Sequence, residues 1–146
     1  MPKLLLQSRV VDNSAEFEVC QPLLLLAMGP VTPQKMAYWR EQYLAGSPYQ
    51  LWNWRRNAQL LGIFGLKLDG VTNHITHIAV SAKYRQQGIG SQMVGDMVKK
   101  FPALYWIAET DEDALGFYQS VGFTAQVLVN QPPGFPIRYR CVLKMP

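Results

Sequence analysis

The chain has 146 residues, of which 49% are hydrophobic and 16% are charged, and this balance argues against a disordered protein. Its length fits a single domain, spanning residues 1–146, that can bury a sizeable core. The formal net charge of +4 suits anionic ligands, but no run of Lys or Arg exceeds two residues, so the sequence shows no dedicated nucleic-acid patch.

The N-terminal third of the chain shows one strand pattern followed by two helix patterns. We expect a strand over residues 3–9 and then a helix whose N-cap is Asp12, Asn13 or Ser14. A second helix is expected over residues 32–44. Thr32 is its expected cap, and Pro33 takes the first helical position, where a missing backbone N–H is tolerated.

The pattern changes to strands from Tyr49 onward. Two strands are expected over residues 49–70, joined by a short turn near Asn57, and a third strand is expected over residues 71–80. Together they predict a three-strand antiparallel meander. The third strand alternates between two faces, with Ile75 and Ala79 on one and Thr76, Ile78 and Val80 on the other.

The C-terminal half combines helices with single strands. An amphipathic helix over residues 90–101 precedes a short apolar strand over residues 103–109, and a strand, a helix and a strand in this order imply a parallel crossover. A further helix is expected over residues 111–123, with Gly122 as its C-cap. The final strands, over residues 123–130 and 136–145, complete an α+β fold with a mixed sheet.

The segment RQQGIG, from Arg85 to Gly90, places two glycines immediately before a helix. It is not a Rossmann fingerprint, because Met93 stands where G-x-G-x-x-G has its third glycine. It is not a P-loop, because no Lys-Ser or Lys-Thr follows the glycines. It fits a third design, in which small residues let backbone N–H groups and a helix N-terminus converge on one anion. A pyrophosphate would lie over Gln86 to Ser91, with Arg85 nearby.

Three linked segments make the chain resemble the GNAT superfamily of acyl-CoA-dependent N-acetyltransferases. They are HIAV, RQQGIG five residues later, and DALGFYQSVGF, which is similar to the family signature A-x-x-F-Y-x-x-x-G-F. The resemblance is strong over residues 71–123. It implies a GNAT fold, an α+β architecture whose mostly antiparallel sheet of about seven strands opens in a V between its fourth and fifth strands and is flanked by about four helices.

The resemblance also implies a site for acetyl-CoA as co-substrate, without a metal. In this family the cofactor lies in the V, and the backbone at the end of the fourth strand pairs with its pantetheine arm as an added strand would. Asp111 stands where many relatives have Asn, and because an ionised Asp cannot donate a hydrogen bond, helix capping is its alternative role. The implied cofactor-binding residues are Ile78, Ala79, Val80, Arg85, Gln86, Gln87, Gly88, Ile89, Gly90, Ser91, Asp111 and Tyr118.

The implied reaction is direct attack of a primary amine on the thioester in a ternary complex. Tyr118 matches the family tyrosine that commonly acts as general acid toward the CoA sulfur; the alternative is a packed aromatic side chain. His74 stands where histone-acetylating relatives carry a glutamate base, and an imidazole titrates near neutral pH; the alternative is a satisfied strand histidine. Glu109 is the second candidate base and would need burial. A regular strand would place His74 and His77 on opposite faces.

The sequence does not identify the acceptor, and a small amine, an amino acid, an antibiotic and a protein N-terminus all remain open. The region that builds the acceptor site in this family is aromatic here, although about half of these side chains are expected in the core. The proline-stiffened loop over residues 130–136 could shape the acceptor channel or contact a second copy in a homodimer. The aromatic residues are Trp39, Tyr43, Trp52, Trp54, Phe64 and Phe135.

Two other classes of function stay open. A non-catalytic acyl-CoA-binding or interaction module would keep RQQGIG without using Tyr118 or His74, and a nucleic-acid-binding protein would lose affinity steeply with salt. Cys20 and Cys141 match no metal-ligand spacing, so a structural zinc is not expected. The apolar runs are too short for a signal peptide or a membrane span, and we expect a cytoplasmic protein with neither membrane nor nucleic-acid partners.

Overall fold

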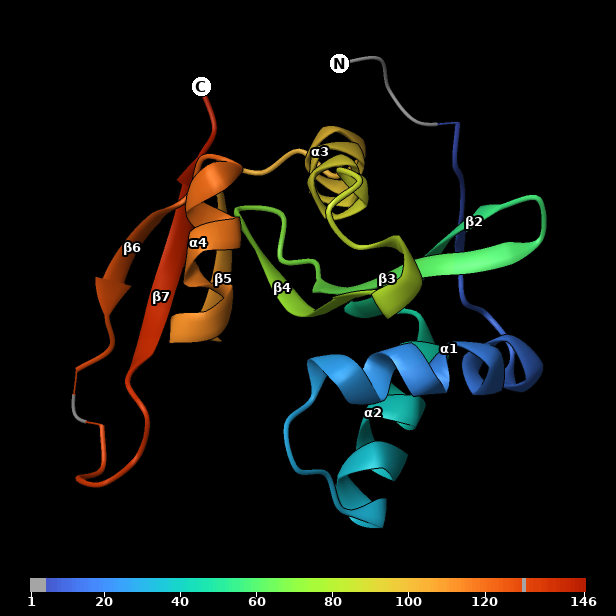
Figure 1. The fold of residues 1–146 in the computed structure, drawn as a ribbon, viewed down its shortest axis with the longest axis horizontal. Coiled ribbons are helices and arrows are strands. Elements are labelled where there is room, and N and C mark those ends of the chain that lie inside the picture. Colours follow the sequence, from blue (N-terminus) through green and yellow to red (C-terminus); the bar gives the residue numbers. More distant parts are fainter. Residues whose placement is uncertain (1–4, 130) are drawn as a thin grey trace.

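The computed structural model describes residues 5–129 and 131–146, and within these ranges it contains seven strands, four α-helices and one short 3₁₀ turn (Figure 1). The strands are β1 (Gln7–Val10), β2 (Tyr49–Arg56), β3 (Gln59–Lys67), β4 (Thr72–Val80), β5 (Tyr105–Asp111), β6 (Thr124–Val127) and β7 (Arg138–Lys144). The helices are α1 (Ser14–Ala27), α2 (Pro33–Ala45), α3 (Ile89–Lys100) and α4 (Glu112–Ser120), and the 3₁₀ turn is Ala82–Tyr84.

All seven strands form one sheet in the order β1-β2-β3-β4-β5-β7-β6. Every neighbouring pair is antiparallel except β4 and β5, which are parallel and joined by the crossover through α3. The expected α+β fold with a mixed, mostly antiparallel sheet is confirmed. The predicted meander is formed by β2, β3 and β4, and β1 adds a further antiparallel strand at its edge.

Several predicted caps and turns are present. Asn13 is the N-cap of α1, and its Oδ1 accepts a hydrogen bond from the Glu16 N–H at 2.9 Å. Thr32 caps α2, whose first residue is Pro33. The hairpin between β2 and β3 turns at Asn57, which has a positive φ of 51° and is followed by Ala58 at 67°, as a tight two-residue hairpin turn requires.

Some predicted boundaries are wrong by a few residues. The first strand begins at Gln7, and residues 3 and 4 of the predicted strand lie outside the described residues. The sixth strand ends at Val127. The Leu128 N–H still donates to the Arg138 carbonyl, but the Leu128 carbonyl accepts from Nε2 of Gln131 at 2.7 Å, and the Arg138 N–H donates to Oε1 of the same glutamine. The predicted end of that strand at residue 130 lies outside the described residues. Helix α4 ends at Ser120, before the predicted C-terminal residues.

Two further boundaries, the end of α4 and the start of β7, have a local cause in the backbone. Val121 caps α4, and Gly122 follows it with a φ of 104°, so this glycine supplies the left-handed residue just beyond the cap. The last strand begins at Arg138 rather than at residue 136, because Pro136 has no N–H to contribute to the sheet.

Helices cover both faces of the sheet and enclose two core clusters (Figure 1). One cluster joins α1 and α2 to β2, β3 and β4, with Phe17, Leu24 and Tyr43 fully buried in it. The other joins α3 and α4 to the sheet around Trp54 and Trp106. None of the helices described is both long and apolar enough to cross a membrane.

A β-bulge interrupts β4 where it faces β3. The register between the two strands shifts after Gly65, so that Gly65 pairs with His77 and Leu66 pairs with Ile75. Thr76 is the extra residue and has no Cα partner on β3. Such a bulge bends a strand and moves the side chains that follow to the other face.

The bulge overturns part of the predicted face pattern of β4. Ile75 packs in the same cluster as Ile78 and Val80, whereas Ala79 packs in the opposite cluster. The prediction that Ile75 and Ala79 share a face is therefore wrong, because the two-residue period of the strand is broken at Thr76.

Candidate active site

The two parallel strands at the centre of the sheet separate after a few residues. β4 pairs with β5 only from Thr72 to Ile75, opposite Tyr105 to Ala108. Beyond this point β4 stays paired with β3 as far as Val80, while β5 stays paired with β7. Within the described chain, one edge of the second half of β4 thus has no strand beside it, and an extended ligand can pair with that edge.

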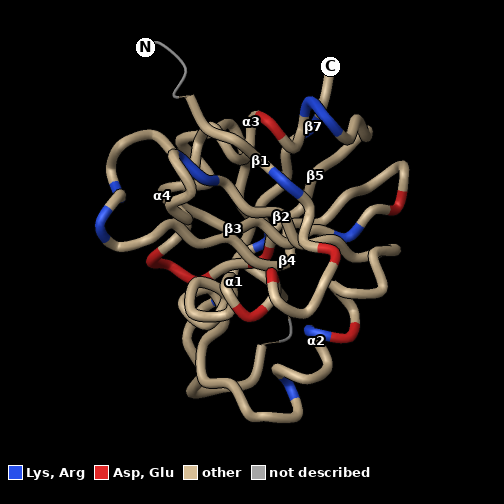
Figure 2. The backbone as a smooth tube through the Cα atoms, turned by 90° about the vertical axis from the view of Figure 1, so that its right-hand side faces the viewer, with Lys and Arg blue, Asp and Glu red and all other residues tan. Residues whose placement is uncertain are grey.

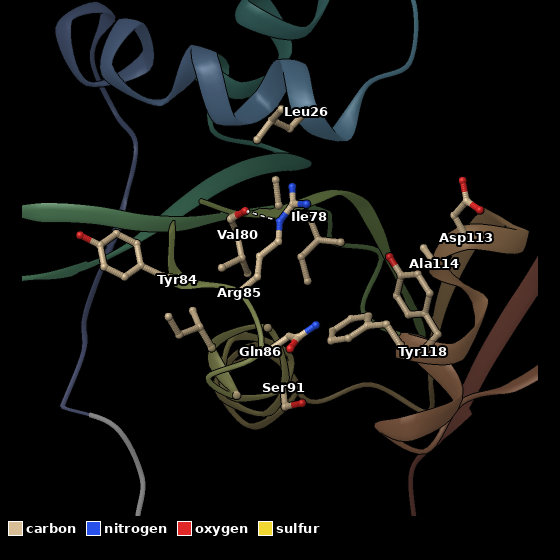
Figure 3. A pocket seen from close by; sticks show the side chains of 15 residues that line it. Leu26, Ile78, Val80, Tyr84, Arg85, Gln86, Ser91, Asp113, Ala114 and Tyr118 are labelled. Atoms are coloured by element: carbon tan, nitrogen blue, oxygen red, sulfur yellow. Dashed lines mark hydrogen bonds between the residues drawn. The ribbon is translucent and has the colours of Figure 1, made fainter. Parts of the chain in front are cut away.

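A cavity of about 520 Å³ lies at this separation (Figure 3). The volume is within the range of small-molecule sites. The walls come from the end of β4, the loop before α3, the first turn of α3, and α4, and Leu26 of α1 lines one side. The lining residues are Leu26, Ile78, Ala79, Val80, Tyr84, Arg85, Gln86, Gly88, Ile89, Gly90, Ser91, Asp113, Ala114, Phe117 and Tyr118.

The loop before α3 turns sharply and directs the start of the helix to the cavity. Gln86 and Gly88 have positive φ angles of 62° and 79°, and Gly88 is the N-cap of α3. No described side chain caps this helix. The N–H groups of its first turn, which have no partner within the helix, can therefore bind an anion.

Gly88 and Gly90 are each required to be glycine, but for different reasons. Gly88 has open space around it, and its positive φ is what requires glycine. At Gly90 a Cβ would lie 2.9 Å from Cε1 of Phe117, so glycine is required by the close approach of α3 to α4. Gly90 shapes the wall of the cavity between the helices.

Tyr118 points from α4 into the cavity and is 4% exposed (Figure 3). Its ring packs against Phe117 and Phe123, with centroids 5.3 Å and 5.4 Å away. Burial, followed by the nearby Cys141 and Asp111, raises the pKa of the Tyr118 phenol above its ordinary value. The phenol therefore stays protonated and can act as a proton donor.

Two of the expected cofactor-binding residues, Gln87 and Asp111, do not line the cavity. Asp111 is the N-cap of α4, and its Oδ1 accepts a hydrogen bond from the Ala114 N–H at 3.2 Å, which is the capping alternative. Arg85 does line the cavity, and its Nε donates to the Val80 carbonyl at 3.3 Å (Figure 3). This bond places a cation at the end of β4.

A second cavity, of about 360 Å³, lies against the same two central strands. It contains both candidate bases, His74 and Glu109, whereas Tyr118 lines the first cavity. Successive parts of β4 contribute to the two cavities, and the expected catalytic residues are divided between them. The residues that line the second cavity are Trp39, Tyr49, Lys67, His74, Ile75, Thr76, Ile107, Glu109 and Arg138.

A single row across the sheet lies along this second cavity. Tyr49, Lys67, His74 and Ile107 are successive Cα partners across β2, β3, β4 and β5. The Lys67 Nζ lies 5.7 Å from the centroid of the Tyr49 ring, and Trp39 of α2 contacts that ring at 5.4 Å. In this row the aromatic side chain of Tyr49, next to Trp39, is followed by the charged side chain of Lys67.

The two candidate bases differ in their surroundings. Burial, followed by the charge of Lys67, lowers the pKa of His74 below its ordinary value. Its imidazole is then neutral at neutral pH and able to accept a proton. Glu109 is exposed, and its Oε2 lies 3.3 Å from a guanidinium nitrogen of Arg140. Glu109 thus lacks the burial that a carboxylate base needs.

A buried hydrogen-bond network holds the bulge beside this cavity. The Tyr43 hydroxyl lies 2.6 Å from Oγ1 of Thr76 and 2.5 Å from Nδ1 of His77. Burial, followed by the charge of Lys35, lowers the pKa of His77 to about 4, so the neutral ring can accept the Tyr43 proton while the Tyr43 oxygen accepts from Thr76. A Cβ on Gly65 would collide with the Tyr43 hydroxyl, so glycine at this position makes the network possible.

The bulge also corrects the expected placement of the two histidines. His74 lines the second cavity together with Trp39, and His77 contacts Trp39 with ring centroids 4.6 Å apart. Both histidines therefore face α2, and the prediction of opposite faces is wrong because Thr76 adds a residue between them.

Four of the six aromatic residues expected near the acceptor, Tyr43, Trp52, Trp54 and Phe64, are buried core residues. Trp52, Trp54 and Phe64 are buried in the cluster beneath α3 and α4. Trp39 and Tyr43 lie on the α2 side, and Phe135 is 70% exposed. Tyr49, which lines the second cavity, was missed, and so was Phe117 in the first. Phe117 adjoins Tyr118 in the FY pair, and that signal was available in the sequence.

Comparison with known proteins gives a family for most of the chain. Residues 16–123 match the family model described as "Acetyltransferase (GNAT) family". A search of curated proteins gave no significant match.

Solved structures share the fold over almost the whole chain. A GNAT family acetyltransferase from Elizabethkingia anophelis with acetyl-CoA bound superposes with a TM-score of 0.71 at 22% identity, covering 98% of this chain and 100% of that one. An aminoglycoside 6'-N-acetyltransferase in complex with coenzyme A gives 0.80 at 14% identity, covering 98% of both chains. The ribosomal-protein-S18-alanine N-acetyltransferase from Escherichia coli gives 0.73 at 14% identity, covering 96% of this chain and 94% of that one.

Proposed function

The chain belongs to the GNAT family of acetyltransferases, and from this premise we propose that it transfers the acetyl group of acetyl-CoA to a primary amine. One observation carries the proposal. The cavity at the separation of β4 and β5 combines an unpaired strand edge, the uncapped N-terminus of α3 and a buried tyrosine. These three features suit an extended arm, a phosphate group and a leaving thiolate, respectively.

Acetyl-CoA fits the chemistry of the residues present. The first-turn N–H groups of α3 would bind the pyrophosphate, and Arg85 and Ser91 also line the cavity. The backbone of Ile78 and Ala79 would pair with the pantetheine arm along the unpaired edge of β4. Tyr118, on α4, would lie toward the thioester.

In the proposed reaction the amine nitrogen attacks the thioester carbonyl carbon, a C–N bond forms and the C–S bond breaks. The nitrogen loses a proton, and the departing sulfur gains one. Tyr118 would donate the proton to the sulfur, because it lines the cavity and its phenol is protonated at neutral pH. His74 would accept the proton from the amine, directly or through water, because its pKa is lowered and its imidazole is neutral at neutral pH.

The second cavity would hold the acceptor. It borders the central strands on the side of α2, and it contains His74 as well as an aromatic side formed by Trp39 and Tyr49. An amine entering from this side would reach the separation of the strands near Thr76. This arrangement would let acceptor and acetyl-CoA be bound together, as direct transfer in a ternary complex requires.

The test combines ligand binding with turnover. Thermal unfolding is measured with and without acetyl-CoA, and a ligand at about 100 times its Kd should add roughly 2.7 kcal/mol to the free energy of unfolding. Thiol release is then followed with a panel of primary amines at several pH values. Stabilisation together with amine-dependent release supports the enzyme, and stabilisation without release for any amine leaves an acyl-CoA-binding module. No stabilisation would overturn the proposal.

A further inference from the structure

The second cavity has a charge pattern that bears on the acceptor. Resting on the proposed function, we propose that the acceptor amine carries a second, anionic group, a carboxylate or a phosphate, which Lys67 and Arg138 bind. Both cations line the cavity, Lys67 from the end of β3 and Arg138 from the start of β7. They flank the central strands β4 and β5, which lie between them in the sheet.

Neither cation has a carboxylate partner among the described residues. The ion pairs in the described part of the chain join Arg40 to Glu18, Arg55 to Glu16 and Arg140 to Glu109, and none includes Lys67 or Arg138. Within residues 5–129 and 131–146, the Arg138 guanidinium donates only to a neutral group, the backbone carbonyl of Glu109, at 3.4 Å. An anionic ligand would supply the missing partner for both side chains.

The one carboxylate of the cavity wall is already neutralised. Glu109 lies 3.3 Å from Arg140, which is outside the lining of the cavity. With His74 neutral, Lys67, Arg138 and Arg140 stand against Glu109 and against Asp69, which acts on His74 from outside the cavity lining, so one positive charge is in excess. Figure 2 shows Lys and Arg interspersed with Asp and Glu along the backbone and not gathered on one face. The positive charge of the second cavity therefore comes from the residues around that cavity.

Both cations are held by their surroundings. The Lys67 ammonium lies over the Tyr49 ring, within the range of a cation–π contact. The backbone of Arg138 is fixed on both sides by one glutamine: its N–H donates to Oε1 of Gln131 at 2.6 Å, and its carbonyl accepts from Nε2 of Gln131 at 3.3 Å. Less side-chain freedom of Lys67 is then lost when the ligand binds, whereas the Gln131 bonds fix only the backbone of Arg138.

A positive cavity also favours the reactive form of the amine. Nearby positive charge disfavours an ammonium ion and so lowers its pKa, which raises the fraction of neutral, nucleophilic amine. A plain alkylamine would be bound weakly by such a wall. An amine with an anionic group gains an attractive partner for that group while its ammonium loses a proton.

The experiment compares matched amines by thiol release in the full chain with acetyl-CoA. The pairs are phenylalanine with phenethylamine, 4-aminobutyrate with butylamine, and phosphoethanolamine with ethanolamine, so that carboxylate and phosphate are tested separately. We expect at least one anionic member to be preferred. Replacing Lys67→Met or Arg138→Met should lower the ratio of kcat/KM values within that pair by roughly tenfold, the loss expected for a charged hydrogen bond. Lys144→Met, at the exposed far end of β7, is the matched control and should keep the ratio.

Binding of the same amines is measured in parallel by thermal unfolding in the presence of CoA. An anionic amine that stabilises the wild-type complex, and does so less in the Lys67 and Arg138 variants, supports the inference. A neutral amine used as well as its anionic partner overturns it, as does a preference that survives both substitutions. Failure of every anionic amine to bind or react also overturns it. Loss of stabilisation by acetyl-CoA itself would instead overturn the proposed function.

Discussion

The hydroxyl of Tyr43 on α2 lies 2.6 Å from Oγ1 of Thr76, the one residue of β4 that the bulge leaves without a partner on β3. The same hydroxyl also bonds His77, the next residue along the strand. A helix therefore holds the strand at the point where β4 begins to leave β5. The contact joins residues 33 positions apart, and we expect the position of the separation and the shape of both cavities to depend on it.

Tyr43→Phe should destabilise the protein and slow the reaction. The substitution leaves Thr76 and His77 buried or half-buried without their shared partner, and an unsatisfied polar group costs about 1–3 kcal/mol. We expect the free energy of unfolding, measured by denaturant titration, to fall by that amount and kcat to fall with it. Tyr38→Phe on the same helix, at a half-exposed position, is the control and should change neither. A Tyr43 variant as stable and active as wild type would show that the network does not hold the bulge.

Gly65→Ala should have a similar effect through a different cause. The new Cβ would collide with the Tyr43 hydroxyl and lie 2.7 Å from Oγ1 of Thr76, so the network must move. Overpacking of this kind costs about 1–3 kcal/mol. Gly95→Ala, on the open side of α3 with nothing near its Cβ, should instead stabilise by roughly 0.5–1 kcal/mol, since alanine is the better helix former. Equal stability of the two variants would contradict the close contact.

Much of the fold follows from local patterns in the sequence. The caps at Asn13 and Thr32, the hairpin turn at Asn57 and the parallel crossover after β4 all depend on residues close to one another in the chain. The loop RQQGIG and Tyr118, which contribute to the lining of the first cavity, could be predicted because they belong to contiguous motifs. These predictions needed only spacing and residue type.

The second cavity could not be predicted in the same way. The bulge at Thr76 results from the register of β3 and β4 and from a contact with α2. Neither can be predicted from the alternation of polar and apolar residues along β4. The row from Tyr49 to Ile107 brings together four strands that lie apart in the sequence. His74 was predicted from the resemblance to the GNAT family and Glu109 as a carboxylate at the end of the fifth strand, and neither argument gave information about Lys67 beside them.

The stability of the protein should depend on His77 in mild acid. Its pKa is about 4 in the folded state and 6.5 as an ordinary value, so the unfolded chain binds the proton first as the pH falls. Stability is therefore complete above pH 6.5 and lost as the pH falls toward 4, by about 3 kcal/mol over the whole interval. His77→Asn keeps an acceptor near Nδ1 but cannot titrate. Denaturant titrations between pH 7 and 4 should show a smaller loss for this variant, and parallel curves would contradict the assignment.

Tyr118→Phe should separate catalysis from binding. The hydroxyl points into the cavity, so its removal should leave the core almost unchanged (Figure 3). Loss of a general acid typically lowers kcat by about 100-fold or more. We expect that loss in thiol release, with the Kd for acetyl-CoA changed by less than about threefold. Unchanged kcat would leave Tyr118 as a packed aromatic side chain and assign the protonation of the sulfur to another group.

Alanine substitutions at Gly88 and Gly90 should distinguish the two reasons for glycine, a left-handed turn at Gly88 and the close approach of Phe117 at Gly90. Gly88→Ala puts a Cβ into open space but keeps a φ of 79°, and a strained left-handed residue costs roughly 1–2 kcal/mol of stability. Gly90→Ala has no such strain, yet its Cβ would lie 2.9 Å from the Phe117 ring, which must turn into the cavity or push α4 away from α3. We therefore expect Gly88→Ala to lower the thermal unfolding temperature without ligand, whereas Gly90→Ala mainly weakens acetyl-CoA binding. A double variant, Gly90→Ala with Phe117→Leu, replaces the ring with a smaller side chain and should recover part of the lost affinity for acetyl-CoA. If affinity is not recovered, Gly90 matters through the backbone N–H groups of α3 and not through its contact with Phe117.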